Sequence, residues 1–373
     1  MEVLIQNSSH VTWQMLLMWG IGGVLIYFAI ARQMEPALLL PMGFGAILVN
    51  LPVAAPGTGV QHVLETLFCI GIKDAELFPL MLFVGIGAMI DFTPLLTNPK
   101  LMIFGAAAQF GIFFTLALAS LLGYDLRDAA SISIIGAADG PTSIYVAAEL
   151  GSKYLGAIMV AAYSYMALVP LIQPPIIKLC TTRAERKIRM RYEGKTVSRT
   201  TKILFPIIVT VIVGLVAPDS VALIGFLMFG NLIRECGVMN SISETAQNTL
   251  ANLITIFLGI TIAAQMKAVD FLRTDTLTII GLGLAAFVFD TIGGIMVAKL
   301  MNLFSTKKIN PMIGAAGISA FPMSARVVHK LGLKEDKQNY LLMHAIGVNV
   351  SGQIASVIAG GLILALIKAQ TGG

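Results

Sequence analysis

The sequence predicts an all-α protein that crosses a membrane many times. Of its 373 residues, 57% are hydrophobic and only 12% are charged. Apolar runs long enough to cross a hydrocarbon core of about 30 Å recur from Trp13 to Lys368, and no polar stretch is long enough for an aqueous domain. Because these runs are continuous and rich in Gly, Ala, Leu and Ile, they are typical of packed helices and not of the alternating strands of a membrane barrel.

The spans of the first half follow the apolar runs in chain order. The first run has no basic residues before it and no small-residue cleavage site after it, so we interpret it as a retained helix and not as a signal peptide. The expected spans are residues 13 to 31, 37 to 52, 77 to 92, 100 to 123 and 153 to 178.

A basic stretch separates the two halves of the chain. Lysine and arginine dominate residues 178 to 202, which places this stretch in the cytoplasm by the positive-inside rule. We therefore expect a first membrane repeat over residues 1–180, a basic cytoplasmic loop over 181–202 and a second, inverted membrane repeat over 203–373. The same rule accounts for the net charge of +5, so nucleic acid is not indicated as a partner.

The second half provides a comparable set of apolar runs. The expected spans are residues 203 to 217, 220 to 233, 253 to 268, 275 to 300 and 338 to 367. Two shorter amphipathic segments, 60 to 72 and 239 to 252, are expected to be interfacial or loop helices.

The two halves share motifs in the same order. LFVGIGAMIDFTPLL, from Leu82 to Leu96, aligns with IFLGITIAAQMKAVDFL, from Ile256 to Leu272. Further along, GAADGPTSIYVAAELG, from Gly136 to Gly151, aligns with GAAGISAFPMSARVVHKLG, from Gly314 to Gly332. Two matches in one order indicate an internal duplication.

Two segments, 127 to 150 and 309 to 331, are each broken by Gly and Pro into pieces too short to cross alone. If the first of them crossed the membrane, the basic loop would fall on the outer side, against the positive-inside rule. Re-entrant hairpins remove this conflict. Each half then has about five spans plus one re-entrant broken-helix hairpin. Because five is odd, the two halves have opposite orientation, which is the inverted-topology repeat of many secondary transporters.

Asp139 stands at the break of the first hairpin, beside Gly140, which supplies backbone freedom, and Pro141, which suits the first helical position. Capping of the following helix is one explanation for this carboxylate. We favour a functional one, because an intramembrane carboxylate is costly unless it serves an ion or proton path. Oxygen ligands for a hard cation are available around both breaks, whereas the histidines and the three cysteines show no metal-like spacing.

Other polar residues accompany the second hairpin and the last span. Asn310 and Ser319 lie in the hairpin segment, and helix capping competes with function as their explanation. Asn349 interrupts the last apolar span, where its amide needs a partner. Nearby, Ser351 fits small-residue helix packing, and Gln353 could bond across helices.

Several further side chains allow two interpretations each. Arg326 either snorkels to the cytoplasmic interface or contacts an anion. For Asp290 and Asp91, late in their spans, an interfacial or packed salt-bridge role is favoured over a site. Tyr163 and Tyr165 fit aromatic packing with a wetted hydroxyl.

The motifs GAADGPTSIY, YSYMALVP, INPMIGAAGISAFPMSARV and GVNVSGQ resemble the membrane β subunit of the sodium-pumping biotin-dependent decarboxylases, along essentially the whole chain. That family includes methylmalonyl-CoA, glutaconyl-CoA and oxaloacetate decarboxylases. The resemblance implies a higher-order complex in the bacterial inner membrane, within the lipid bilayer. A carboxyltransferase α subunit would carboxylate biotin on a separate carrier subunit, and a small membrane anchor subunit would complete the assembly.

The resemblance also implies what this chain does. It would decarboxylate carboxybiotin, consume a proton and drive sodium ions out of the cytoplasm. It would carry no covalent biotin itself, since the pair Met266 and Lys267 lacks the second Met of an attachment site. The compact length resembles the methylmalonyl-CoA and glutaconyl-CoA members more than the longer oxaloacetate ones.

Carried over by motif, the family's sodium- and proton-handling residues fall on Asp139, Tyr165, Asn310, Gly314, Ser319, Arg326 and Asn349. We expect sodium between the two hairpins, with the ligand set Asp139, Asn310, Gly314, Ser319 and Asn349. Asp139, Tyr165 and Arg326 are expected to be catalytic. Of these, Tyr165 would relay the proton, and Arg326 would bind the carboxylate of carboxybiotin by two hydrogen bonds.

Two rival functions share this predicted fold. A sodium-coupled secondary transporter of organic anions would use the same inverted repeats and broken helices without chemistry. The other alternative is that this chain is only a membrane anchor. The fold alone does not separate them.

Overall fold

The computed structural model describes residues 10–52, 59–191, 194 and 196–371, and within these residues it contains helices and no strands. Seven of the described helices are long and apolar enough to cross a membrane by length and composition. They are Trp13–Ala31, Pro99–Leu121, Leu155–Cys180, Arg199–Val216, Asn240–Ala263, Thr274–Phe304 and Leu342–Gln370. The predicted all-α polytopic membrane fold is confirmed.

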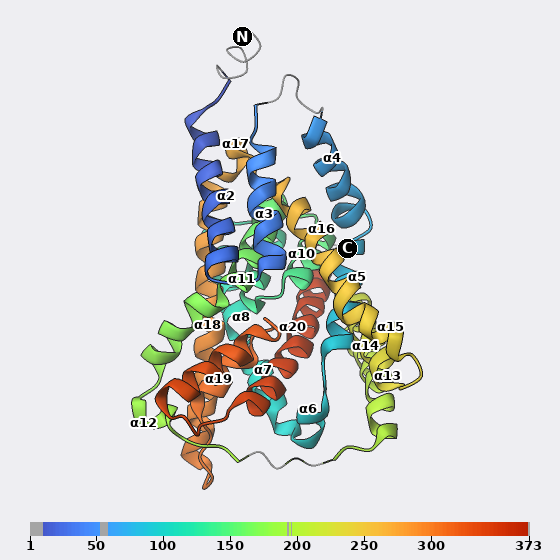
Figure 1. The fold of residues 1–373 in the computed structure, drawn as a ribbon, viewed down its shortest axis with the longest axis vertical. Helices are drawn as coiled ribbons and strands as arrows, with labels where there is room; N and C mark the ends of the chain where they lie inside the picture. Colours follow the sequence, from blue (N-terminus) through green and yellow to red (C-terminus); the bar gives the residue numbers. More distant parts are fainter. Residues whose placement is uncertain (1–9, 53–58, 192–193, 195, 372–373) are drawn as a thin grey trace.

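The first half follows the predicted order of spans (Figure 1). Its apolar helices are α2 (Trp13–Ala31), α3 (Pro36–Val49), α5 (Leu77–Met89), α7 (Met102–Ala107), α8 (Phe110–Leu121) and α11 (Leu155–Cys180). The short elements between them are α4 (Gly59–Phe68), the π-helix η1 (Cys69–Lys73), α6 (Thr93–Thr97) and η2 (Pro99–Leu101). The predicted short helix at residues 60 to 72 therefore corresponds to α4 and η1.

The second half begins after the short helix α12 (Arg183–Arg186), which lies in the basic loop. Its apolar helices are α13 (Arg199–Val216), α14 (Val221–Glu235), α16 (Ala251–Ala263), α18 (Thr274–Phe304) and α20 (Leu342–Thr371). Shorter elements are η4 (Pro218–Ser220), α15 (Asn240–Glu244), the π-helix η5 (Thr245–Leu250) and α17 (Ala268–Phe271).

One boundary in this half differs from the prediction. Residues 239 to 252 were expected to form a helix separate from the span at 253 to 268, but α15, η5 and α16 run on as one helix, Asn240–Ala263. No Gly or Pro occurs between Asn240 and Leu258, so nothing in the backbone ends the helix where its composition changes from polar to apolar. Within this helix, Thr245–Leu250 is π-helical.

Both segments predicted to be broken hairpins are interrupted. The first consists of α9 (Leu126–Ser133), a 3-10 turn η3 (Ile134–Ala137) and α10 (Gly140–Glu149), and Ala138 at its break has a left-handed backbone with φ 51°. The second consists of the 3-10 helix η6 (Pro311–Gly317) and α19 (Met323–Glu335). In each segment, a helix begins after a capping residue whose side chain accepts a hydrogen bond from a backbone N–H. The capping residue is Asp139 for α10 and Asn310 for η6.

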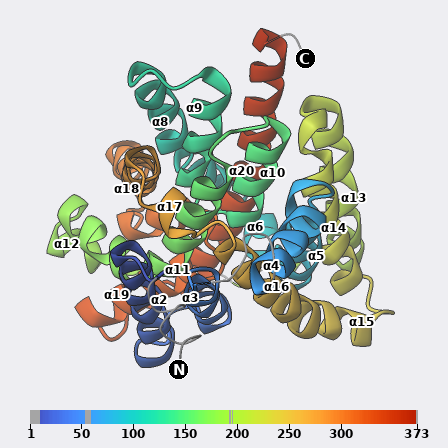
Figure 2. The same cartoon turned by 90° about the horizontal axis from the view of Figure 1, so that it is seen from above.

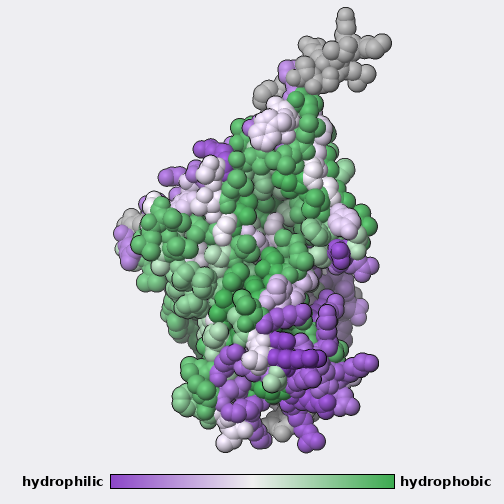
Figure 3. All heavy atoms as spheres, turned by 90° about the vertical axis from the view of Figure 1, so that its left-hand side faces the viewer, coloured by the Kyte–Doolittle hydropathy of each residue, from purple (hydrophilic) through white to green (hydrophobic). Residues whose placement is uncertain are grey.

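The outer surface suits lipid. Large apolar side chains stand exposed on the peripheral helices, such as Leu215 and Val216 on α13. Figure 3 shows a face that is hydrophobic over its middle and hydrophilic at its lower end, where Figure 1 places α12 and α19. Seen from above in Figure 2, α10, α11 and α20 lie among the surrounding helices. The polar residues in the middle of these helices are buried, namely Thr142 and Ser143 of α10 and Asn349, Ser351, Gln353 and Ser356 of α20.

Candidate sodium and proton site

The two breaks meet inside the protein. The backbone N–H of Ser319, just after η6, donates to the carbonyl of Ala137 at the end of η3, over 2.9 Å. Backbone groups freed by a break in a membrane must find such partners. This contact joins the two segments that the sequence had singled out, although they lie far apart along the chain.

Asp139 is the acidic centre of the first break. It is only 3% exposed, and its Oδ2 accepts hydrogen bonds from Thr142 Oγ1 (2.7 Å), Gln353 Nε2 (2.8 Å) and Ser356 Oγ (3.0 Å). Its Oδ1 faces the backbone N–H of Thr142 at 3.4 Å, so the capping role considered from the sequence is present. No Lys, Arg or His among the described residues forms an ion pair with it.

The remaining partners of Asp139 come from α20. Gln353 and Ser356 lie on the same face of this helix as Asn349, because the spacings of four and three residues each amount to about one turn. The expectation that Gln353 bonds across helices is confirmed. Ser356 and Thr142 were not predicted from the sequence, but the regular spacing of polar residues in an otherwise apolar helix was a usable signal for Ser356.

Tyr163 lies beside the same break. A Cβ at Gly140 would come within 2.4 Å of the Tyr163 ring, so only glycine allows the turn to approach α11 this closely. The Tyr163 hydroxyl is buried and has no hydrogen-bond partner among the described residues. Buried hydroxyls normally find a partner, so this one is an exception beside the break.

Asn349 links α20 to the second break. Its amide Nδ2 donates to the carbonyl of Ile318 over 2.6 Å, while its Oδ1 is buried without a partner among the described residues. Ser319 donates through Oγ to the carbonyl of Gly352 at 3.0 Å. One helix therefore touches both breaks, the first through Gln353 and the second through Asn349.

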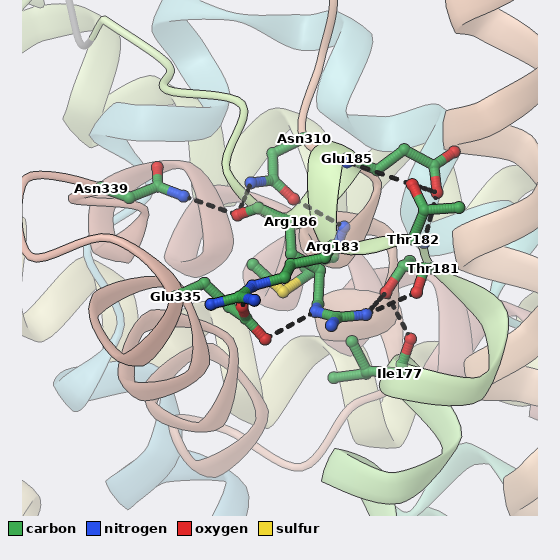
Figure 4. Close-up of polar contacts among 10 residues, drawn as sticks. Ile177, Thr181, Thr182, Arg183, Glu185, Arg186, Asn310, Glu335 and Asn339 are labelled. Carbon is green, nitrogen blue, oxygen red and sulfur yellow. Dashed lines mark hydrogen bonds and ion pairs between the residues drawn. The ribbon is translucent and has the colours of Figure 1, made fainter.

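Asn310 lies in a different place, at the basic loop. Its Nδ2 donates to the carbonyls of Arg186 (3.0 Å) and Ile188 (2.9 Å), and its Oδ1 accepts from the N–H of Met312. Figure 4 shows this contact beside the ion pair of Arg186 with Glu335, which measures 2.8 Å. No hydrogen bond joins Asn310 to Asp139 in the described part of the chain, so the structure does not bring these two predicted ligands together.

Three further predicted residues have separate surroundings. Gly314 packs directly on α18, since a Cβ there would lie 2.1 Å from the carbonyl oxygen of Gly294. The hydroxyl of Tyr165 donates to the carbonyl of Ile280. Arg326 is exposed on α19, and its charge acts on Glu35 in the loop between α2 and α3, where burial raises the pKa of the Glu35 carboxyl and Arg326 opposes that rise.

Comparison with known proteins gives a consistent result. The family described as "Na+-transporting oxaloacetate decarboxylase beta subunit" matches residues 14–367. The chain belongs to this family. The glutaconyl-CoA decarboxylase subunit beta of Acidaminococcus fermentans is 48% identical, over 98% of this chain and 96% of that protein. The methylmalonyl-CoA decarboxylase subunit beta of Veillonella parvula is 49% identical, over 93% and 92% respectively.

A relative that acts on another substrate is nearly as similar. The oxaloacetate decarboxylase beta chain of Haemophilus ducreyi is 46% identical over 96% of both proteins. The family resemblance read from the motifs is confirmed, and the chain is the membrane subunit of a sodium-transporting decarboxylase. As a β subunit, it is part of a complex with other subunits.

Proposed function

We propose that this subunit decarboxylates carboxybiotin presented by a separate carrier subunit and couples that step to sodium export across the bacterial inner membrane, with consumption of a proton. The observation that carries the proposal is Asp139, a buried carboxylate at a helix break. Neutral polar side chains surround it, and no cationic side chain among the described residues pairs with it. Such intramembrane carboxylates mark ion and proton paths.

The side chains around Asp139 fit a sodium ion. Besides the carboxylate, Thr142 and Ser356 offer hydroxyl oxygens, and the Gln353 amide can present its oxygen after rotation about its last side-chain bond. In many membrane transporters, ion sites rich in oxygen ligands lie at the breaks of discontinuous helices. Sodium at this position would neutralise the carboxylate, and the hydroxyls would turn their lone pairs toward the ion.

Two further oxygens lie where the second break meets α20. The unpartnered Oδ1 of Asn349 and the hydroxyl of Ser319 stand where α20 meets the end of η6. We place sodium binding across Asp139, Ser319 and Asn349, with α20 as the shared wall. Asn310 and Gly314 then act on the second hairpin itself, Asn310 by fastening its start to the basic loop and Gly314 by allowing close packing on α18.

Arg326 suits the encounter with carboxybiotin. Its guanidinium is exposed on α19, next to the basic loop that the positive-inside rule assigns to the cytoplasm. A guanidinium binds a carboxylate through two parallel hydrogen bonds. Tyr165 is the proposed proton relay in this scheme. The carboxyltransferase α subunit, the biotin carrier and a small membrane anchor are the proposed partners in the assembly.

Alternating access would come from movement between two inverted repeats, over residues 1–180 and 203–373, joined by the basic loop 181–202. The meeting of the two breaks at Ser319 and Ala137 supports this division, since in inverted-repeat transporters the site lies where the repeats face each other.

An acyl-CoA is the proposed substrate class of the complex. Alignments with the oxaloacetate relatives extend over 419 and 431 residues, more than the 373 residues of this chain, so those relatives contain inserted segments. The alignment with the glutaconyl-CoA relative extends over only 366 residues. Release of carbon dioxide by the purified complex from glutaconyl-CoA or methylmalonyl-CoA, and not from oxaloacetate, would support this choice.

Asp139→Asn tests the central proposal, because it removes the charge at nearly constant shape. We expect sodium-dependent decarboxylation by the intact complex to fall on the order of 100-fold, as for other disrupted ion sites. Carbon dioxide release and uptake of radioactive sodium into proteoliposomes measure the two coupled activities. Asp128→Asn is the matched control, since the buried Asp128 carboxylate is already satisfied by Ser152 and the N–H of Lys153.

The same measurements separate the rival functions. Normal sodium-dependent turnover of Asp139→Asn would leave this chain a membrane anchor only. Sodium uptake that requires an organic anion and releases no carbon dioxide would identify a secondary transporter instead.

A further inference from the structure

A second carboxylate, Asp290, is buried in the middle of α18 and is fully shielded from solvent. Its Oδ1 accepts the backbone N–H groups of Gly111 (2.5 Å) and Ile112 (3.3 Å). These groups belong to the first turn of α8, which starts after the interruption that separates it from α7. One half of the carboxylate therefore caps a helix inside the protein.

The other half of the carboxylate has no such partner. Oδ2 of Asp290 is buried without a hydrogen bond in the described residues. It faces the first break, because a Cβ at Gly136 would lie 2.6 Å from this oxygen and 2.8 Å from the Cβ of Ala286. The oxygen is thus in close contact with the backbone of η3 and with apolar atoms.

Neutralising charge is missing around Asp290. The elements α7, α8, η3 and η6, which pack on α18, contain no titratable side chain in their sequences. The other elements that contact α18 contain titratable residues, which are Arg127 and Asp128 at the start of α9, Tyr163, Tyr165, Lys178 and Cys180 on α11, and Asp270 on α17.

Two charges of α18 itself and one nearby carboxylate complete the set. Asp275 lies in the first turn of α18, and Lys299 pairs with Glu185 at 3.2 Å. Asp139 follows η3 by two residues and has its own partners from α20. Among the described residues, no Lys, Arg or His pairs with Asp290. An ionised carboxylate is very unfavourable in such surroundings.

We propose that Asp290 is a second cation-binding carboxyl of this subunit, separate from Asp139, and that its ligand is a proton on Oδ2. Sodium needs several oxygen ligands, whereas this oxygen is covered by Gly136 and Ala286. A proton adds no volume. Uptake of the proton converts the carboxylate to a neutral acid. Release of the same proton restores the negative charge, which the two backbone N–H groups of α8 then stabilise.

The position of Asp290 makes this protonation relevant to both breaks. Gly136 of η3 covers Oδ2, and Gly294, one turn further along α18, packs on Gly314 of η6. A charge appearing on Asp290 would therefore disturb the packing of both broken segments on α18. This inference does not depend on sodium at Asp139, although it adds a proton-binding group to the proposed coupling.

Infrared spectroscopy of the intact complex tests the proposal, because the carbonyl stretch of a protonated carboxyl is distinct from that of a carboxylate. With aspartate isotopically labelled at the side-chain carboxyl, we expect the wild type at neutral pH to show a protonated aspartate band that persists when sodium is added. Asp290→Asn should abolish this band, and Asp128→Asn should leave it unchanged. If Asp139 turns out to have no role in sodium binding, we still expect this protonated aspartate band.

Two outcomes would overturn the proposal. One is a wild-type spectrum without any sodium-insensitive protonated aspartate, which can be judged even if Asp290→Asn fails to assemble. The other is an assembled Asp290→Asn complex that binds fewer radioactive sodium ions per β subunit than the wild type and whose spectrum retains the band. That result would make Asp290 a sodium ligand.

Discussion

At the scale of single residues, the hydroxyl of Ser356 is the clearest test of how Asp139 is held. It donates to Oδ2 of Asp139 over 3.0 Å from a fully buried position. We expect Ser356→Ala to raise the sodium concentration for half-maximal turnover about tenfold, because a hydrogen bond to a charged group contributes about 1.5 kcal/mol or more. The measurement is decarboxylation by the complex as a function of sodium concentration.

Ser351→Ala is a well-matched control for this variant. Ser351 is equally buried on the same helix, but its hydroxyl bonds to the carbonyls of Leu101 and Val348 and not to Asp139. Its sodium dependence should match the wild type. Equal sodium dependence in both variants would show that Ser356 has no part in the sodium site.

The sequence predicted some of these residues better than others. Asp139 could be found because a carboxylate beside Gly and Pro in an apolar stretch is costly and therefore conspicuous. Thr142 could not, since a hydroxyl in an apolar helix usually serves packing, and Ser356 was signalled only by its spacing from Asn349 and Gln353 on one helix face. The contact of Asn310 with the basic loop depends on how distant segments fold together, which local sequence does not encode.

At the scale of elements, the packing of η6 on α18 rests on two glycines. A Cβ at Gly314 would lie 2.1 Å from the Gly294 carbonyl, and backbone atoms cannot yield as a flexible side chain can. We expect Gly314→Ala to displace η6 and destabilise the subunit by about 1–3 kcal/mol, as overpacked cores do. Thermal inactivation of the detergent-solubilised complex measures this loss.

Gly281→Ala on α18, the helix that η6 packs against, provides the comparison. A Cβ at Gly281 meets nothing within 4 Å, so this variant should be as stable as the wild type or slightly more stable. A Gly314→Ala complex with wild-type stability would mean that η6 and α18 do not pack as closely as described.

Most element boundaries could be predicted because Gly, Pro and charged residues mark them, as at α2, which has the predicted bounds. The continuous helix Asn240–Ala263 could not, because its change in composition has no backbone signal. The interruption between α7 and α8 was also absent from the prediction, which treated residues 100 to 123 as one span. The capping of α8 by Asp290 is a tertiary contact between residues 179 positions apart.

At the scale of the whole molecule, composition alone predicted a polytopic helical protein, and the parity of crossings suggested two inverted halves. Which helix would touch both breaks could not be predicted. That helix is α20, because its polar face reaches Asp139 through Gln353 and Ile318 through Asn349. Any motion of one half against the other must therefore rearrange the contacts of this one helix.

The basic loop fastens the first half to the second hairpin, and this connection is expected to depend on pH. Arg189 donates to Asp336 over 2.6 Å, and that hydrogen bond lowers the pKa of the Asp336 carboxyl below its ordinary value. The ionised carboxylate therefore stabilises the docked loop at every pH above the ordinary Asp pKa of about 3.9. This contribution is lost only as the pH falls through the lower pKa of the docked state.

Asp336→Asn removes the same charge at neutral pH, where Arg189 remains protonated. We expect faster tryptic cleavage within the basic loop than in the wild type, because the undocked loop is accessible to protease. The increase should be a few-fold, since an exposed ion pair contributes little to stability. Asp125→Asn, which alters an exposed carboxylate at the start of α9, should leave cleavage unchanged. Cleavage of Asp336→Asn at the wild-type rate would mean that the loop is held without this pair, by contacts such as those of Arg186 with Glu335 and of Asn310 with the Arg186 and Ile188 carbonyls.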